Sequence, residues 1–457
     1  MSIIKGKCSI IILSYNQVEF TKNCLESIRR YTTCPYELIV VDNASNEETV
    51  TYLEVQEDII LIKNQSNQGF AGGCNQGMQR ATGEYIMLLN NDTIVTYHWL
   101  ENMVDLMESS EEISLVGPLT NNTVGKQKIE VPYDNNLDAM QEFAKKLSVS
   151  QKKPWRTLRL VAFCVLIRRS VLDEIGMLDT EFKIGNYEDD DFCIRALLKN
   201  KSLYICRRSF VHHYMNISFT KNNVPREEIM LTNKLLLEKK WNGMDWNHHA
   251  VTNEWMIQKV LMQEGESILH IGCGLGAVSI ELKDNNPGYH IVGVEDHPIR
   301  KKIAQQFLDE SYDWDKKLNF LSQIGNRQYD TIIVECMVEK SGMELLERLK
   351  PLLQDNGQIL LRIFNIRHIT TLERLVTGMV GGNLLCASSN EFCYYYDKDV
   401  RNDMIDKYEF DILSEVDVRK TFTNKQGNLI DTMNGYPDYV TDAGVYNRLY
   451  LLKAKRN

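Results

Sequence analysis

The sequence predicts an α/β protein that is built from two successive domains. Two observations lead to this prediction. Short, fully apolar runs alternate with segments of helical spacing, which is typical of a mainly parallel sheet covered by helices on both faces. After a polar stretch near residues 242–249, the same alternation begins again. Ligands of such sheets bind at the carboxyl ends of the strands, so the residues that follow each strand are the candidates for function.

In the first half, the predicted strands are apolar runs, and the predicted helices have apolar residues at helical spacing. The expected strands are residues 9–13, 37–41, 59–63, 85–89 and 160–167. The expected helices are residues 18–30, 47–54, 75–81, 137–147 and 168–175. Residues 120–158 are mostly polar, and a long loop of this kind often acts as a lid or a binding loop.

The second series follows the same pattern. Its expected strands are residues 267–271, 290–295, 330–335, 357–363 and 448–454, with a glycine loop at 272–276 and a helix at 277–285. Between the two series, Pro225 precedes a charged helical segment. We therefore expect a first domain at 1–222, a helical linker at 223–253 and a second domain at 254–457.

Composition excludes several classes of protein. The 457 residues are enough for two to four domains of about 100–200 residues each. A net charge of -10 argues against a nucleic-acid partner, because nucleic-acid binders usually carry a basic excess. The apolar run at residues 8–13 is too short for an export signal, and no stretch is long enough to span a bilayer. The 11 cysteines lack paired spacing, so we expect reduced thiols and a cytoplasmic location.

The first two candidate features follow predicted strands in the first half. Asp42 comes directly after an apolar run, where a carboxylate can accept a hydrogen bond from a base or a ribose hydroxyl. It would serve equally as a helix cap or in an Asx turn. The stretch from Asn67 to Asn75 contains three glycines, which permit close approach of a ligand. A merely flexible loop is the alternative.

Two acidic motifs follow later. Asn90, Asn91 and Asp92 end a predicted strand, and oxygen ligands of this kind can hold a divalent cation that bridges a diphosphate. An exposed turn is the alternative. The run from Glu188 to Asp191 offers a carboxylate that could deprotonate a hydroxyl. Acidic residues also favour the first turn of a helix for purely structural reasons.

Together, the order and spacing of these motifs resemble the family 2 glycosyltransferases, especially the bacterial rhamnosyltransferase-like branch. The matching pieces include SIIILSYN, ELIVVDNAS, NQGFAGGCNQG, ATGEYIMLLNNDT, NYEDDDFCIRAL and VHHYMNISF, and they span about half of the chain. The resemblance implies a GT-A fold and an enzyme that inverts the anomeric centre in a single in-line displacement. It also implies a nucleotide-sugar donor and a glycan or protein acceptor.

The resemblance further implies roles for donor-side residues. Asp42 would contact the nucleotide base, and Asn67 and Asn75 would shape the nucleotide-sugar site. Asn90 and Asn91 belong to the triplet that faces the donor, with asparagine where many relatives have an acidic residue.

Catalytic and metal-binding roles follow in the same way. Asp92 would hold Mg or Mn. Asp189 matches the general base, and Asp191 is its nearest rival. His212 matches a late histidine near the diphosphate or metal, and His213 is the alternative at that place.

The second series carries a separate nucleotide-binding pattern. Gly272, Gly274 and Gly276 follow a strand and open a helix, and Glu295 ends the next strand. This spacing suits a cofactor with a ribose, because glycines allow close approach and the acid accepts from the ribose hydroxyls.

This segment resembles the class I S-adenosylmethionine-dependent methyltransferases, which have a Rossmann-like fold. HIGCGLG, VGVE, YDTIIVECMVE and LKPLLQDNGQILLRIFN carry the resemblance, over about residues 254–366. It implies S-adenosylmethionine as a cofactor. His270 departs from the pattern, because relatives usually have an acidic residue there. A hydride-transfer domain is the alternative.

Three functions are compatible with these observations. The first is an inverting, metal-dependent glycosyltransferase with an attached methyltransferase-like domain. That domain is an active methyltransferase acting on the glycan, a cofactor binder without activity, or a degenerate structural relic. The second is a scaffold of a glycan-assembly complex without catalysis. The third is a methyltransferase with an accessory sugar-binding domain. A homo-oligomer is compatible with each of them.

Overall fold

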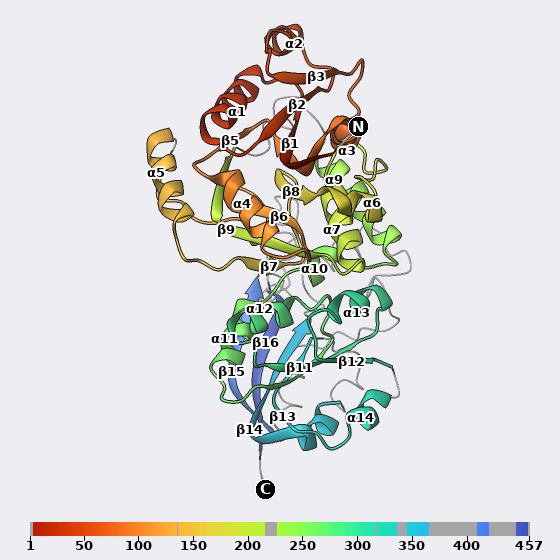
Figure 1. The fold of residues 1–457 in the computed structure, drawn as a ribbon. Helices are drawn as coiled ribbons and strands as arrows, with labels where there is room; N and C mark the ends of the chain where they lie inside the picture. Colours follow the sequence, from red (N-terminus) through yellow and green to blue (C-terminus); the bar gives the residue numbers. More distant parts are fainter. Residues whose placement is uncertain are drawn as a thin grey trace, which may run out of the picture. The chain divides into compact units, whose positions relative to one another are not determined.

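The computed structural model describes residues 3–134, 136–214, 226–315, 318–335, 345–364, 409–419 and 445–455 (Figure 1). The chain forms two compact units, Met1–Lys240 and Trp241–Asn457, and each is described by itself. The division falls inside the segment that the sequence indicates as a linker. Helix α9 (Arg226–Lys240) belongs to the first unit, whereas helix α10 (Trp246–His249) belongs to the second.

One half of the sheet in the first unit is parallel. Its strands are β1 (Ile4–Ser14), β2 (Tyr36–Asp42), β3 (Ile59–Lys63) and β4 (Gly83–Asn90), in the order β3-β2-β1-β4. Each neighbouring pair runs in the same direction. The carboxyl ends of these strands therefore meet at one edge of the sheet, as the sequence predicts.

The other half of this sheet is mixed, so the prediction of a mainly parallel sheet is wrong for this part. Strand β8 (Cys164–Arg168) runs antiparallel to β4 and to β6 (Ile113–Leu119). Strand β9 (Ser202–His213) is parallel to β6 but antiparallel to β5 (Thr93–Val95) and β7 (Trp155–Thr157). Because β5 and β9 pair, the residues after β4 lie beside the end of β9.

Seven further helices accompany this sheet among the described residues of the first unit. They are α1 (Val18–Tyr31), α2 (Glu47–Glu54), α3 (Gly69–Arg80), α4 (Trp99–Glu108), α5 (Leu137–Ser148), α6 (Arg169–Ile175) and α7 (Glu188–Leu198). A buried cluster that includes Leu25, Val40 and Trp99 joins α1 and α4 to one face of the sheet.

Helix α3 begins six residues earlier than the sequence predicts, because the glycine-rich stretch is itself helical. Its glycines allow the helix to pack directly on β1. A Cβ atom added to Gly73 would lie 2.2 Å from Leu13 Cδ1, and one added to Gly77 would lie 2.4 Å from Ile11 Cγ2. These glycines therefore serve close packing of the helix against the sheet.

The second unit has a seven-stranded sheet. Its strands are β10 (Ser267–Ile271), β11 (His290–Glu295), β12 (Glu310–Asp313), β13 (Tyr329–Val334), β14 (Leu353–Phe364), β15 (Phe410–Arg419) and β16 (Val445–Ala454). Their order is β12-β11-β10-β13-β14-β16-β15. The first five strands are parallel, in the order of a doubly wound sheet, and β16 runs antiparallel to β14 and β15.

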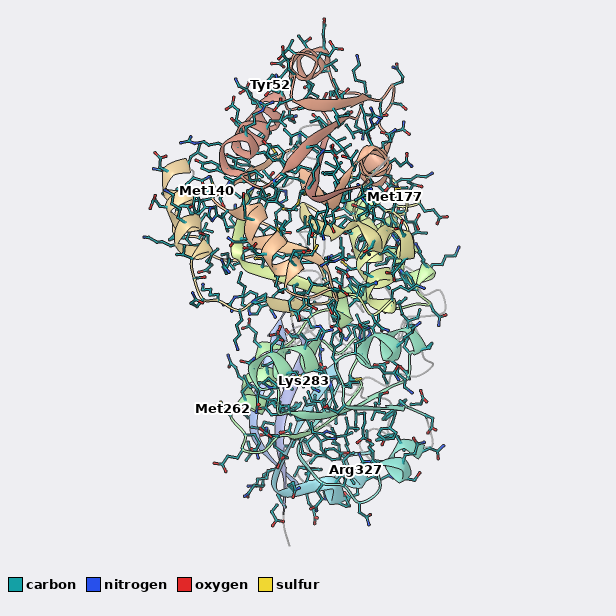
Figure 2. The ribbon with its side chains drawn as sticks, viewed as in Figure 1. Tyr52, Met140, Met177, Met262, Lys283 and Arg327 are labelled. Atoms are coloured by element: carbon teal, nitrogen blue, oxygen red, sulfur yellow. The ribbon has the colours of Figure 1, made fainter. Side chains whose placement is uncertain are left out.

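Short helices pack on both faces of this sheet. They are α11 (Glu254–Leu261), α12 (Ala277–Asn285), α13 (Pro298–Ala304), α14 (Asn319–Ile324) and the 3-10 helix η1 (Lys350–Leu352). Along β10, Ile268 joins the core under α11 and α12, while Leu269 joins the core on the opposite face. Lys283 and Arg327, both labelled in Figure 2, form ion pairs with Asp309 and Glu310.

Candidate active site

Asp42 and Asn43 stand at the carboxyl end of β2, and both are buried. Asp42 Oδ1 accepts a hydrogen bond from the Ser45 main-chain N–H at 3.3 Å, which is the Asx turn that the sequence offered as an alternative. Asn43 donates from Nδ2 to Asn67 Oδ1 at 2.8 Å and accepts the Gln68 N–H at 2.9 Å. Sequence reasoning missed Asn43, which ties the end of β2 to the segment before α3.

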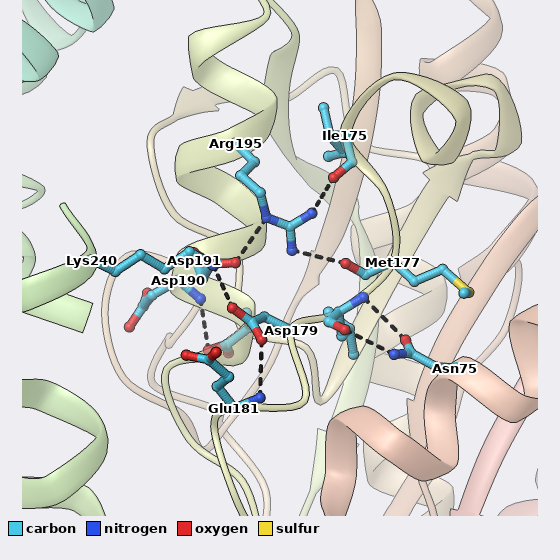
Figure 3. A network of polar contacts seen from close by, with 11 residues as sticks. Asn75, Ile175, Met177, Asp179, Glu181, Asp190, Asp191, Arg195 and Lys240 are labelled. Atoms are coloured by element: carbon cyan, nitrogen blue, oxygen red, sulfur yellow. Dashed lines mark hydrogen bonds and ion pairs between the residues drawn. The ribbon is translucent and has the colours of Figure 1, made fainter. Parts of the chain in front are cut away.

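Asn67 and Asn75 are held by protein groups. Asn67 Oδ1 also accepts the N–H of Gly69, the first residue of α3, at 2.8 Å. Asn75 makes two reciprocal hydrogen bonds with the main chain of Leu178, at 2.8 and 3.0 Å, as Figure 3 shows. Asn75 therefore fixes α3 against the segment after α6.

The triplet after β4 has a different role for each residue. The Asn90 carbonyl accepts the Thr93 hydroxyl at 2.7 Å. Asn91 is buried and donates to Thr21 Oγ1 at 3.0 Å. Asp92 is 6% exposed, and its Oδ1 lies 3.3 Å from His213 Nε2. The triplet thus brings one carboxylate to the end of β9.

Of the two adjacent histidines, His213 faces Asp92. Its Nδ1 lies 2.9 Å from the Asn122 carbonyl, and because a carbonyl only accepts, Nδ1 must donate. In the neutral ring, the Nε2 lone pair then points toward Asp92. His212 contacts the Tyr133 hydroxyl at 3.1 Å instead, because neighbouring residues on a strand point to opposite faces. Burial, together with His213, lowers the pKa of His212 to about 4.

Asp92 and His213 have the chemistry of a divalent-cation site. Metal-binding histidines usually donate their second ring N–H to a carbonyl or carboxylate, and His213 does so. Within the described residues, no group of three or more His, Cys, Asp or Glu side chains could hold a metal ion. Two protein ligands are enough for Mg or Mn when phosphate oxygens and water complete the coordination.

The acidic run at the start of α7 contains one carboxylate that differs from the rest. Glu188, Asp190 and Asp191 are buried, whereas Asp189 is half-buried. Asp189 accepts the Ala162 N–H at 3.1 Å and the Asp190 N–H at 2.9 Å. The run begins a helix, and Asp189 is the acid of this run that is only half-buried.

The other three acids are enclosed. Asp190 pairs with Arg159 at 2.7 Å. Asp191 lies 2.8 Å from both Arg195 Nε and Lys240 Nζ, in the network of Figure 3. Burial and the neighbouring Asp189 raise the pKa of Glu188 well above its usual range. Glu188 Oε2 has no hydrogen-bond partner among the described residues.

In the second unit, the glycine loop after β10 has a backbone that favours glycine. Gly272, Gly274 and Gly276 have φ angles of 76°, 57° and 84°, which favour glycine. Protein side chains lie close to two of these glycines. A Cβ atom added to Gly274 would lie 3.1 Å from His249 Nδ1, and one added to Gly276 would lie 2.9 Å from the Phe307 ring.

Glu295 is held by several protein groups. Its Oε2 accepts the Gly274 N–H at 2.7 Å, and its Oε1 accepts Arg300 Nε at 2.8 Å and the His297 N–H at 3.0 Å. It is 3% exposed, and burial raises its pKa to about 7 although Arg300 lies against it. Arg300 Nη1 also donates to His249 Nε2 at 2.9 Å. Arg300 and two main-chain N–H groups thus occupy Oε1, whereas Oε2 accepts the N–H of Gly274 and keeps a second lone pair.

His270 occupies the position where the resemblance leads us to expect an acid. Its Nε2 lies 3.1 Å from Glu335 Oε2, and Arg362 Nη1 donates to Glu335 Oε1 at 2.9 Å. Burial opposes ionisation of Glu335, but His270 and Arg362 hold its pKa at about 2. His270 thus belongs to an internal ion-pair network that links β10, β13 and β14.

Known proteins resemble the first unit. A model of "Glycosyl transferase family 2" matches residues 9–176. The uncharacterized glycosyltransferase YwdF of Bacillus subtilis is 30% identical over 195 residues, which cover 42% of this chain and 68% of YwdF. The low-salt glycan biosynthesis hexosyltransferase Agl10 of Haloferax volcanii is 25% identical over 209 residues, which cover 44% of this chain and 64% of Agl10. The chain thus spans just under two thirds of Agl10.

Similar solved structures include GalNAc-T7 with UDP, GalNAc and Mn²⁺, with 15% identity, a TM-score of 0.41, and coverage of 53% of this chain and 49% of that one. The mannosyltransferase PcManGT of Pyrobaculum calidifontis, in complex with GDP-Man and Mn²⁺, has 17% identity, a TM-score of 0.38, and coverage of 51% and 64%.

The fold of the first unit and its sequence matches define a glycosyltransferase. The chain belongs to glycosyl transferase family 2. Its first unit has an α/β GT-A-like glycosyltransferase fold, as the sequence predicts.

Proposed function

We propose that the first unit is an inverting, metal-dependent glycosyltransferase that moves a sugar from a nucleotide-sugar donor to a hydroxyl group. The observation that supports this proposal is that two acidic residues have different surroundings. Asp92 is paired with a histidine that has a free Nε2 lone pair in its neutral form, while Asp189 is the one half-buried carboxylate at the start of α7.

Asp92 and His213 would hold Mg or Mn. The cation would offset negative charge on the diphosphate as it leaves. We prefer His213 to His212 for this role, because His212 lies against Tyr133 instead. The Mn²⁺ in the two solved structures belongs to those proteins, and we extend only the choice of metal to this chain.

Asp189 would act as the general base. Its carboxylate takes the proton of the acceptor hydroxyl, whose oxygen forms a bond to the anomeric carbon from the side opposite the diphosphate. The bond between the anomeric carbon and the phosphate oxygen breaks, and the nucleoside diphosphate leaves with its electron pair. We do not favour Asp191 for this step, because Arg195 and Lys240 occupy its two oxygens.

The donor would lie along the carboxyl ends of β2 and β4. Asp42 would contact the base, and Asn43 and Asn67 would hold the backbone around it. Asn75 and Asn91 would support the site from within, because each is bound to another part of the protein. Asn90 would face the donor.

A donor screen tests this proposal. The full chain is incubated with a panel of nucleotide sugars, with Mg and with Mn, and mass spectrometry follows the released nucleoside diphosphate. We expect release from one donor or a few related donors, and none in the presence of a chelator. Absence of release with every donor in both metals would refute the proposal.

We propose that the acceptor is a surface glycan or protein. We also propose that the protein acts in glycan biosynthesis, which is the process that the name of Agl10 states for that protein. We propose a cytoplasmic location. In the described part of the chain, the search for a bilayer-spanning helix finds none.

For the second unit we propose a class I methyltransferase-type fold whose cofactor site is closed. The antiparallel β16 beside β14 disfavours the hydride-transfer alternative, because the dinucleotide-binding order has a sixth parallel strand. The residues present fit S-adenosylmethionine poorly, because Arg300 is paired with the buried Glu295, and His249 lies close to Gly274. These contacts favour a second unit that does not transfer methyl groups, attached to a first unit that transfers sugars.

A further inference from the structure

The loop that leads into helix α7 has an unusual backbone. Ile184, Gly185, Asn186 and Tyr187 have φ angles of 68°, 146°, 78° and 75°. Residues other than glycine rarely adopt positive φ, and a β-branched residue such as Ile184 does so least readily. A run of such residues persists only where its surroundings hold it in place. The residues that hold this loop therefore determine where α7 begins.

Asn233 of helix α9 holds the loop from one side. Its amide nitrogen Nδ2 lies 3.2, 3.0 and 3.1 Å from the carbonyl oxygens of Lys183, Gly185 and Asn186. The Asn233 side chain is buried, with 3% of the residue exposed. Carbonyl oxygens only accept, and the two N–H groups of Asn233 serve the three together. The Gly185 carbonyl also accepts the side-chain amide of Asn186 at 2.8 Å.

The start of helix α3 holds the loop from the other side. The Phe70 N–H donates to the Ile184 carbonyl at 3.0 Å. A Cβ atom added to Gly69 would lie 3.0 Å from the Ile184 nitrogen, so the two backbones are in close contact. The loop thus connects helix α3, on the side of the site proposed for the nucleotide sugar, to helix α7, which carries Asp189.

Helix α9 also contacts α7 at its own end. Lys240 Nζ lies 2.8 Å from Asp191 Oδ1 and 2.5 Å from Asp179 Oδ2, and Figure 3 shows Lys240 beside these carboxylates. Two residues of α9, Asn233 and Lys240, therefore fix the same helix start through a loop contact and an ion pair.

We propose that Asn233 is a positioning residue for the transfer reaction, which it supports by holding residues 183–187 in the conformation that presents Asp189. This inference rests on the proposed role of Asp189 as the base. It makes α9 a part of the transferase, although the helix lies outside the family match at residues 9–176.

The test compares Asn233→Ala with Leu235→Ala in the full chain. Leu235 lies on the same helix and is 56% exposed, so its truncation is the matched control. Hydrogen exchange of residues 184–188 is measured by mass spectrometry. Hydrolysis is measured at saturation with the nucleotide sugar that the wild type hydrolyses fastest. We expect exchange about tenfold faster and hydrolysis about tenfold slower or more in Asn233→Ala, and no change in Leu235→Ala.

Asn233→Ser keeps one hydrogen-bond donor, so we expect intermediate rates of exchange and hydrolysis. If Asn233→Ala does not fold, Asn233→Ser takes its place in the test. Unchanged exchange, or faster exchange with unchanged hydrolysis, would overturn the inference. If the wild type hydrolyses no nucleotide sugar, the proposed function fails, whereas unchanged exchange in an active enzyme would refute only the role of Asn233.

Discussion

At the scale of single residues, exposure separates the acids at the start of α7. Three of the four are enclosed, and Asp189 alone remains half-buried. We expect Asp189→Asn to lower kcat roughly 100-fold or more, because the amide cannot accept the proton of the hydroxyl. The measurement is nucleoside diphosphate release at saturating donor. Asp173→Asn, which changes an exposed acid on α6, should retain wild-type activity; equal activity of both variants would exclude Asp189 as the base.

The two histidines at the end of β9 make a second comparison. We expect His213→Ala to raise the Mn concentration for half-maximal activity roughly 10- to 100-fold, because Asp92 would be left as the remaining protein ligand. His212→Ala should leave this concentration unchanged, since His212 contacts Tyr133. A metal titration of each variant gives the answer. The reverse result would assign the metal contact to His212.

Glu335 gives a prediction about pH. Its pKa of about 2 lies below its ordinary value of 4.5, so it stabilises the fold above about pH 4.5, and this contribution is lost as pH falls toward 2. We expect Glu335→Gln to lower the free energy of unfolding by about 2–3 kcal/mol at pH 7. The difference from wild type should narrow at pH 3. Urea unfolding at both pH values tests this, with Asp313→Asn, 80% exposed at its side chain, as the control.

At the scale of elements, α3 depends on glycine where it touches β1. We expect Gly73→Ala to destabilise the protein by about 1–3 kcal/mol, because its Cβ would lie 2.2 Å from Leu13 Cδ1. A Cβ atom added to Gly72, on the same helix, would have only Gln68 Cβ as a close neighbour, at 3.1 Å. We therefore expect Gly72→Ala to destabilise the protein less than Gly73→Ala. Urea unfolding of the two variants measures the difference. Similar free energies of unfolding for the two variants would show that α3 moves away from β1 without loss of stability.

The elements also show what the sequence can predict. Long apolar runs such as β1 and β10 were predicted because burial on both faces leaves a continuous pattern. Helix α3 was predicted too short, because glycines favour a loop by local propensity, and only contact with β1 explains them. The short strands β5, β7 and β12 have too few residues for a periodic pattern.

In the candidate site, too, some features could be predicted from the sequence and others could not. Asp92 and Asp189 were predicted from motifs at strand and helix ends. The contact of Asn233 with the carbonyl of Gly185 could not be predicted, because 48 residues separate them and the pattern of α9 indicates only a charged helix. The contact of Arg300 with Glu295 could not be predicted either, since no sequence pattern marks Arg300 as its partner.

At the scale of the whole molecule, the second unit decides whether the chain has one activity or two. We expect calorimetry with S-adenosylmethionine at millimolar concentration to show no binding to the full chain, because Glu295 is buried against Arg300 and His249 lies close to Gly274. A nucleotide sugar on the same sample is the positive control. Binding of one equivalent of S-adenosylmethionine in the micromolar range would restore methyl transfer as a second function.

The contact between Lys240 and Asp191 has a consequence for synthesis on the ribosome. The last described strand of the first unit, β9, ends at His213 and therefore leaves the ribosome before residue 240 does. Until then, Asp191 lacks one of its two cations, and until residue 233 emerges the loop before α7 lacks its amide donor. A nascent chain that carries every family motif is therefore still incomplete as a transferase. Activity should arise only when α9 has been translated and has docked.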